Sequence, residues 1–160
     1  EPYRTFWRDL ALWLTEGRFP GQALNKFATH ISQRFSDFNT REFHVEASLI
    51  QDETDYILLP HSDVPHKVLS FLFYLPANND MEHLGTSIYL PKDPRFTCDG
   101  SKHWDAALFE RLMTMPYRPN SLFAFVKTMN SFHGVEHVDT PNVRRDLLFF
   151  DLKTRLDTVV

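Results

Sequence analysis

The chain has 160 residues, of which 42% are hydrophobic and 14% aromatic; this is enough to bury one substantial core, so a single domain spanning residues 1–160 is expected. The formal net charge of −4 gives no overall attraction to phosphate backbones or anionic membranes, which argues against nucleic acid as a partner. No apolar stretch approaches the roughly 18 residues of a membrane-spanning helix. The one cysteine, Cys98, cannot form an intramolecular disulfide. A soluble protein in a reducing, cytoplasmic compartment is therefore expected.

The N-terminal part, residues 1–38, is predicted to be helical. Apolar residues recur at helical spacing over residues 5–15 and again over residues 22–35. This period is typical of amphipathic helices that pack one face against a sheet. We expect both helices to buttress the fold and to carry no chemistry.

After Asn39 the period changes to two, and apolar residues alternate with polar ones over residues 43–49, as in a half-buried strand. Further short strands are predicted between Pro, Gly and Asn turn residues, at residues 56–59, 67–75, 86–90, 121–126, 132–138 and 145–152. Many short strands after a helical start favour a mostly β sandwich or barrel. Residues 92–119 are the least regular, and an insertion over the barrel mouth is predicted there.

Two potential metal ligands, His61 and Asp63, follow the predicted strand that ends at Leu59 and Pro60. A two-residue spacing on extended backbone points both side chains to the same side, which suits two ligands of one ion. With a distant second histidine they would form the facial triad of two histidines and one carboxylate, which leaves positions open on Fe(II) for an oxidant and a cosubstrate. A polar turn also produces His-x-Asp by chance, so the motif depends on its surroundings.

The order of the surrounding segments supplies that support. The segments are Leu58-Leu59-Pro60-His61-Ser62-Asp63, Lys67-Val68-Leu69-Ser70-Phe71-Leu72-Phe73-Tyr74-Leu75-Pro76, Gly85-Thr86-Ser87-Ile88-Tyr89, Ser131-Phe132-His133-Gly134-Val135 and Arg144-Arg145-Asp146-Leu147-Leu148. In this order the chain resembles the prolyl-4-hydroxylase-like branch of the Fe(II)/2-oxoglutarate oxygenase superfamily over about residues 43–152. The resemblance implies a double-stranded β-helix, which is a jelly-roll or cupin-like barrel, with the N-terminal helices as a buttress.

The resemblance also implies a ligand set for a catalytic Fe(II). His61 and Asp63 would be the first two ligands, and His133 in the His-Gly-Val element would be the third. His137 is the rival for the third position, but it lies outside the His-Gly-Val element that carries the resemblance, so His133 is preferred. Asp63 fills the position that iron halogenases of the superfamily leave to a halide, so hydroxylation is expected instead of halogen transfer.

For the cosubstrate, Arg144 or Arg145 resembles the basic residue that grips the distal carboxylate of 2-oxoglutarate. The spacing from the distal histidine favours Arg144, although strand alternation would then turn Asp146 inward beside it; Arg145 avoids that repulsion. Tyr74 resembles the tyrosine that donates a hydrogen bond to the same carboxylate, and a core aromatic is an equally good interpretation. Lys67 is expected to be a solvated charge at a strand end.

The implied activity is that of a dioxygenase that uses Fe(II), 2-oxoglutarate and O₂. It would hydroxylate an unactivated C–H bond of an amino acid, a peptidyl residue or a small metabolite, with release of succinate and CO₂. Two other functions stay open, because fold alone does not determine function: a non-catalytic jelly-roll protein that binds or senses a ligand, and a cupin-type metalloenzyme that does not use 2-oxoglutarate. Asp146 beside the arginines, and Thr86 where relatives often have a glycine, keep these alternatives open.

Overall fold

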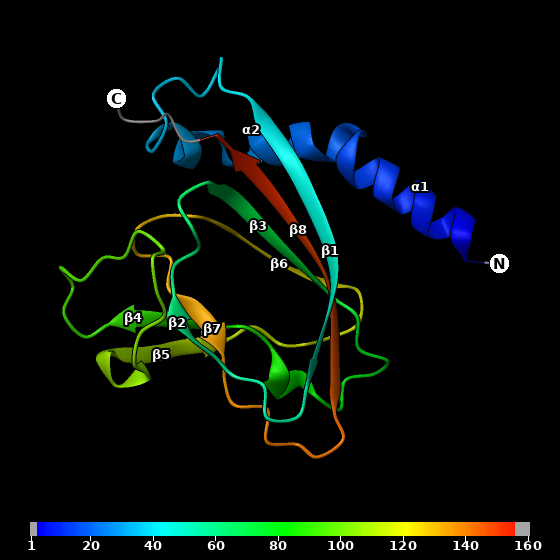
Figure 1. The fold of residues 1–160 in the computed structure, drawn as a ribbon, viewed down its shortest axis with the longest axis vertical. Coiled ribbons are helices and arrows are strands. Elements are labelled where there is room, and N and C mark those ends of the chain that lie inside the picture. The colour runs from blue at the N-terminus through cyan, green and yellow to red at the C-terminus, as the bar shows by residue number, and fades with distance from the viewer. Residues whose placement is uncertain (1–2, 156–160) are drawn as a thin grey trace.

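The computed structural model describes residues 3–155 (Figure 1), so the outermost residues of the predicted domain lie outside it. Two helices are followed by eight strands, with short 3-10 turns η1 (Glu82–Leu84) and η2 (Ala106–Leu108) between strands. The helices are α1 (Arg4–Thr15) and α2 (Arg18–Ser32), and the strands are β1 (Phe43–Glu53), β2 (Leu58–His61), β3 (Lys67–Tyr74), β4 (Ser87–Pro91), β5 (Phe109–Thr114), β6 (Ser121–Val126), β7 (His133–Val135) and β8 (Arg144–Thr154).

The strands form two antiparallel sheets of four strands each. The larger sheet has the order β1-β8-β3-β6 and the smaller sheet the order β2-β7-β4-β5. Each sheet therefore alternates strands from the first and second halves of the chain, as in a jelly roll whose two halves fold over each other. This arrangement confirms the predicted double-stranded β-helix, and Figure 1 shows the smaller sheet beside the long, twisted strands of the larger one.

The larger sheet has two faces with different partners. On the helix face, Leu148, Phe150 and Leu152 of β8 pack with β3 residues under Leu14 of α1 and Ile31 of α2. On the interior face, which looks toward the smaller sheet, the same strands present other side chains, because successive residues of a strand point to opposite sides. In register, Ser70 lies opposite Asp151, Leu72 opposite Phe149 and Tyr74 opposite Leu147. The helix face thus forms an apolar core, and the interior face also carries polar groups.

The two N-terminal helices lie along the helix face, as predicted (Figure 1). Helix α2 begins at Arg18, four residues before the predicted start, because Pro20 falls in its first turn. A proline is tolerated there, since the first N–H groups of a helix have no partner within the helix. Among residues 3–155, no helix is long and apolar enough to cross a membrane.

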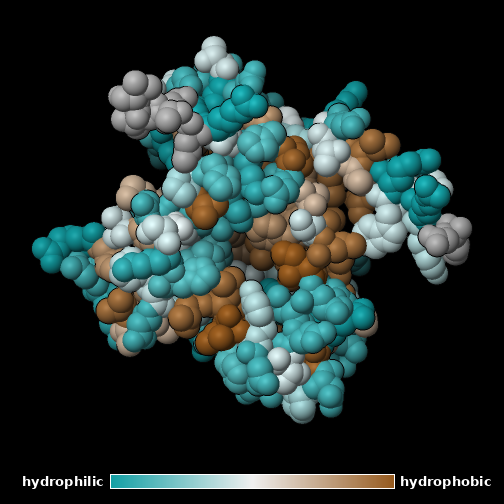
Figure 2. All heavy atoms as spheres, viewed as in Figure 1, coloured by the Kyte–Doolittle hydropathy of each residue, from teal (hydrophilic) through white to brown (hydrophobic). Residues whose placement is uncertain are grey.

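Helix α1 covers the sheet only in part. Figure 2 shows hydrophobic side chains along this helix and over the middle of the sheet in the same view. Phe6 is 59% exposed, and Leu49, on the helix face of β1, is 62% exposed. Helix α2 therefore covers its part of the helix face, whereas the part near the N-terminal end of α1 stays exposed to solvent.

The prediction of an irregular insertion over residues 92–119 was wrong in one respect, because strand β5 lies within it. β5 pairs with β4 at the edge of the smaller sheet. Of its six residues only Phe109 is buried, so the strand shows no alternation of apolar and polar residues. Its hydrogen bonds to β4, and not a buried face, hold it in place.

Candidate metal centre

The pairing of β2 with β7 brings two histidines together. His61 and His133 lie directly opposite each other in this antiparallel ladder, where facing side chains are close neighbours. Gly134 makes the close pairing possible, since a Cβ atom at this position would lie 2.3 Å from the carbonyl oxygen of Leu58. Asp63 follows β2 at a spacing of two from His61 and completes the group.

The three side chains form a cluster with the geometry of a metal site. The Nε2 atoms of His61 and His133 each lie 3.9 Å from Oδ1 of Asp63. This distance is less than twice a metal–nitrogen bond of about 2.1 Å. All three residues are buried, and their ligand atoms lie within 4.8 Å of one another. One ion can therefore contact all three atoms.

Both imidazoles are held in the tautomer that a metal requires. Nδ1 of His61 lies 3.0 Å from the carbonyl oxygen of Leu59, and Nδ1 of His133 lies 3.0 Å from that of Ser131. A carbonyl oxygen only accepts hydrogen bonds, so each Nδ1 carries the proton and each Nε2 keeps a free lone pair. Burial lowers the pKa of His61 to about 4 and also lowers the pKa of His133. The donor set is thus two neutral imidazoles and a carboxylate, which fits Fe(II).

Ionisation of Asp63 is secured by its neighbours. Its Oδ2 accepts a hydrogen bond from Ser70 Oγ at 2.8 Å, and Lys67 Nζ lies 3.1 Å from Oδ1. Burial raises the pKa of the Asp63 carboxyl, but the charge of His133 when protonated, the charge of Lys67 and the Ser70 hydrogen bond outweigh it. The pKa is consequently below its ordinary value. Asp63 is therefore available as an anionic ligand.

A second carboxylate, Asp151, shares these partners. Lys67 Nζ lies 3.1 Å from Asp151 Oδ2, and Ser70 Oγ lies 2.8 Å from Asp151 Oδ1. A hydroxyl group has a single hydrogen, so Ser70 can donate to only one of the two carboxylates. Burial raises the pKa of Asp151, which favours a proton on this residue in the contact with Ser70. The side chain of Lys67 is 13% exposed, so the expectation of a solvated strand-end charge was wrong.

The segment that carries Asp63 is fixed from the other side by Ser62. Ser62 Oγ donates to the carbonyl oxygen of Cys98 at 2.6 Å and accepts from Lys127 Nζ at 3.0 Å. Lys127 is 2% exposed, and burial lowers its pKa. Gly100, with φ at +99°, lies so close that a Cβ atom would be 2.1 Å from the Asp63 carbonyl oxygen. These contacts leave the ligand loop little freedom.

The triad opens into a cavity of about 180 Å³ between the sheets. Pockets for drug-sized ligands have roughly 300–1,000 Å³, so this one admits only a small molecule. Aliphatic and aromatic side chains form much of its wall. Its polar lining consists of Asp52, Tyr56, His61, Asp63, Lys67, Thr86, His133 and Arg145.

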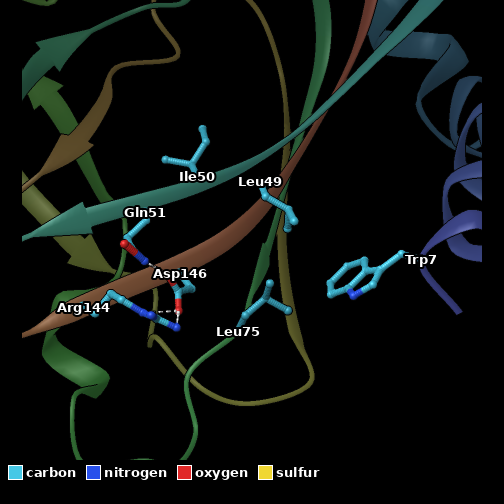
Figure 3. Close-up of a pocket in the computed structure, with 7 residues that line it drawn as sticks. All are labelled: Trp7, Leu49, Ile50, Gln51, Leu75, Arg144 and Asp146. Carbon is cyan, nitrogen blue, oxygen red and sulfur yellow. Dashed lines mark hydrogen bonds and ion pairs between the residues drawn. The ribbon is translucent and has the colours of Figure 1, made fainter. Parts of the chain in front are cut away.

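The two candidate arginines lie on opposite faces of the larger sheet. Arg145 is 2% exposed and lines the cavity with the triad. Arg144 is 66% exposed and pairs with Asp146 at 2.8 Å. Figure 3 shows this pair in a separate hollow, of about 340 Å³, that Trp7 of α1 also lines. Asp146 therefore faces away from the triad, and its charge does not oppose a ligand there.

Tyr74 lies behind the cavity wall. Its hydroxyl donates to Thr86 Oγ1 at 2.8 Å and accepts from the Thr86 N–H at 3.1 Å. Thr86, not Tyr74, lines the cavity.

The rival ligand His137 lies outside the triad: its side chain is 53% exposed and pairs with Asp55 at 3.5 Å. His103, for which the sequence suggested no role, places its ring 4.6 Å from that of His61.

Comparison with known proteins places the fold. No protein-family model and no curated protein matches the sequence. A prolyl-4-hydroxylase from Pseudomonas putida has a TM-score of 0.50 and 15% identity, with 86% of this chain and 65% of that chain covered. HygX from Streptomyces hygroscopicus, with nickel and 2-oxoglutarate bound, has a TM-score of 0.49 and 12% identity over 74% of this chain and 59% of its own. The likeness to the prolyl-4-hydroxylase shows a common fold, and this chain spans slightly less than two thirds of that structure's length.

The low pKa of His61 makes stability depend on pH. We expect the metal-free protein to lose stability as the pH falls from 6.5, the ordinary histidine value, to about 4. In this window the unfolded chain binds a proton that the folded chain excludes, so acid favours unfolding. The loss from this residue is at most about 3 kcal/mol. Urea unfolding with a chelator should show a shallower pH slope in His61→Gln than in wild type or His137→Gln; equal slopes in all three contradict the expectation.

The triad should bind one divalent ion. We expect the purified protein to bind one equivalent of Fe(II) or Mn(II) and to release it on acidification, because the imidazoles must be neutral to bind. The double variant His61→Ala, His133→Ala should lose this binding, and His137→Ala should keep it. Calorimetric titration with Mn(II) measures each case. Undiminished binding in the double variant would show that the ion lies elsewhere.

Proposed function

We propose that this chain is an Fe(II)- and 2-oxoglutarate-dependent dioxygenase that hydroxylates an unactivated C–H bond of an amino acid, a peptidyl residue or a small metabolite. The observation that carries the proposal is one cavity that joins the triad of His61, Asp63 and His133 to the buried guanidinium of Arg145. The fold shared with a prolyl-4-hydroxylase supports it. The combination offers a metal ligand set and an anion anchor within reach of one small molecule.

In this proposal different residues bind the metal and the cosubstrate. His61, Asp63 and His133 would hold Fe(II), and bound iron with 2-oxoglutarate and O₂ supplies the oxidising chemistry. Arg145 would anchor the distal carboxylate of 2-oxoglutarate, because a guanidinium offers several donors in a fixed plane. The Thr86 hydroxyl accepts from Tyr74, so its own hydrogen is free to point toward the same carboxylate.

The cavity wall would keep water from the reacting centre. Leu72, Leu147 and Phe149 of the larger sheet and Leu58 and Val135 of the smaller one line the cavity. An apolar wall strengthens the interactions of the charged groups beside it, because it screens them less than water does. The carboxylate of Asp63 would occupy the coordination position that a halide needs, so the product should gain oxygen and not a halogen.

We assign the activity to the reducing cytoplasm, on the basis of the free, buried thiol of Cys98.

One observation favours a second candidate, a metalloenzyme of the cupin type that does not use 2-oxoglutarate. Arg145 already pairs with a carboxylate of the protein, Asp52, and so has a partner without a cosubstrate. The two functions differ in a simple assay. A dioxygenase forms succinate from 2-oxoglutarate when Fe(II) and O₂ are present, even slowly without the prime substrate, and a cupin-type enzyme forms none.

The position of Arg145 leads to a quantitative expectation. Arg145→Ala should weaken binding of 2-oxoglutarate to the Mn(II)-loaded protein by at least about thirtyfold, since losing a buried charged partner removes roughly 2–5 kcal/mol. Arg144→Ala should change it little, because Arg144 lies on the other face of the sheet. Calorimetric titration measures both, with Mn(II) binding as the control for an intact triad. Near-wild-type affinity in Arg145→Ala would remove this residue from the site.

A further inference from the structure

The carboxylate of Asp52 and the guanidinium of Arg145 form a buried ion pair beside the candidate site. Asp52 on β1 and Arg145 on β8 are direct partners in the strand register, and both side chains line the cavity. Their side chains are 6% and 2% exposed. A buried arginine without a partner would be strongly destabilising. In the protein without a ligand, Asp52 therefore neutralises the charge of Arg145, as the carboxylate of a bound ligand would.

The donors of Arg145 are already partly used. Nε donates to the carbonyl oxygen of Leu84 at 2.6 Å, and Nη1 donates to Asp52 Oδ2. Nη2 has only a long contact of 3.5 Å to Thr86 Oγ1. An incoming carboxylate would meet Nη2 and the Thr86 hydroxyl first. It would then share the guanidinium with Asp52 or displace it.

We propose that Asp52 competes with the cosubstrate for Arg145 and so sets the affinity of the site for dicarboxylates. This inference rests on the proposed function, because it takes 2-oxoglutarate as the ligand. Two carboxylates on one guanidinium repel each other, and the largely apolar wall of the cavity weakens the screening of that repulsion. Asp52 would relieve it by taking up a proton, whether or not it keeps its contact with Nη1.

The surroundings of Asp52 favour the uptake of a proton. Arg145 of β8, Tyr56 between β1 and β2, and Tyr117 between β5 and β6 are the titratable groups whose charges couple to Asp52. Burial raises the pKa of both tyrosines, so they are neutral near pH 7. Burial likewise raises the pKa of Asp52, against the opposing charge of Arg145. A ligand that takes over this arginine would raise it further.

The direct test compares two ligands on two proteins. Wild type and Asp52→Asn, both loaded with Mn(II), are titrated calorimetrically with 2-oxoglutarate and with 2-oxobutyrate, which has the same keto acid but no distal carboxylate. We expect Asp52→Asn to bind 2-oxoglutarate at least about tenfold more tightly, since coupling between buried charges is worth more than 1.4 kcal/mol. Binding of 2-oxobutyrate should not change. Equal or weaker binding of 2-oxoglutarate by a folded Asp52→Asn overturns the inference.

If Asp52→Asn does not fold, the wild-type protein decides the question. Titrations at pH 7 in buffers of different ionisation enthalpy give the number of protons taken up on binding. We expect greater uptake with 2-oxoglutarate than with 2-oxobutyrate, and equal uptake overturns the inference. Failure of the proposed function gives a different result, because then no variant that binds Mn(II) binds 2-oxoglutarate at all, and the inference fails with it.

Discussion

Charge buried between the two sheets must be compensated inside the protein, and this constraint organises the interior of the barrel. A buried ion without a partner is strongly destabilising. Lys67 lies between Asp63 and Asp151, and Arg145 lies opposite Asp52. Each compensating contact also fixes a side chain that the candidate site needs. The orientation of the Asp63 carboxylate and the position of the guanidinium thus follow from the same requirement that keeps the interior stable.

The larger sheet separates stability from chemistry by strand alternation. Along β8, Leu148, Phe150 and Leu152 join the apolar core under the helices, whereas Arg145 and Phe149 line the cavity. Side chains one residue apart on a strand face opposite sides, so one strand can supply both layers without sharing a residue between them. The polar interior is tolerable because apolar clusters are buried on both sides of the sheet: one lies under the helices, and a second, which includes Leu72 and Leu147, lies in the interior. A substitution in the cavity therefore removes no side chain from the layer under the helices, but one that leaves Arg145 or Asp52 without its partner would be destabilising.

The sequence predicted most of the fold, and the site only where the signal is local. His61 and Asp63 stand two residues apart, so their common direction follows from strand geometry alone. The choice between Arg144 and Arg145 depends on which residues β1 and β3 place opposite them, and that register is a property of the folded sheet. Asp52 gave no signal for the same reason, because it lies far from Arg145 along the chain. Strand β5 was missed because an exposed edge strand has no apolar alternation.

The net charge of the side chains that line the cavity determines which ions and charged ligands it can bind. Among the side chains that line the cavity, the negative charges of Asp52 and Asp63 are balanced by the positive charges of Lys67 and Arg145. The wall of the cavity therefore has a net charge near zero when no ligand is bound. A dianion alone would bring uncompensated charge beside largely apolar walls, which is unfavourable. A divalent ion at the triad can bind first, because the Asp63 carboxylate would be one of its ligands, and its charge would then offset that of a dianion. The ion pair of Arg145 with Asp52 allows the chain to stay folded in the absence of both.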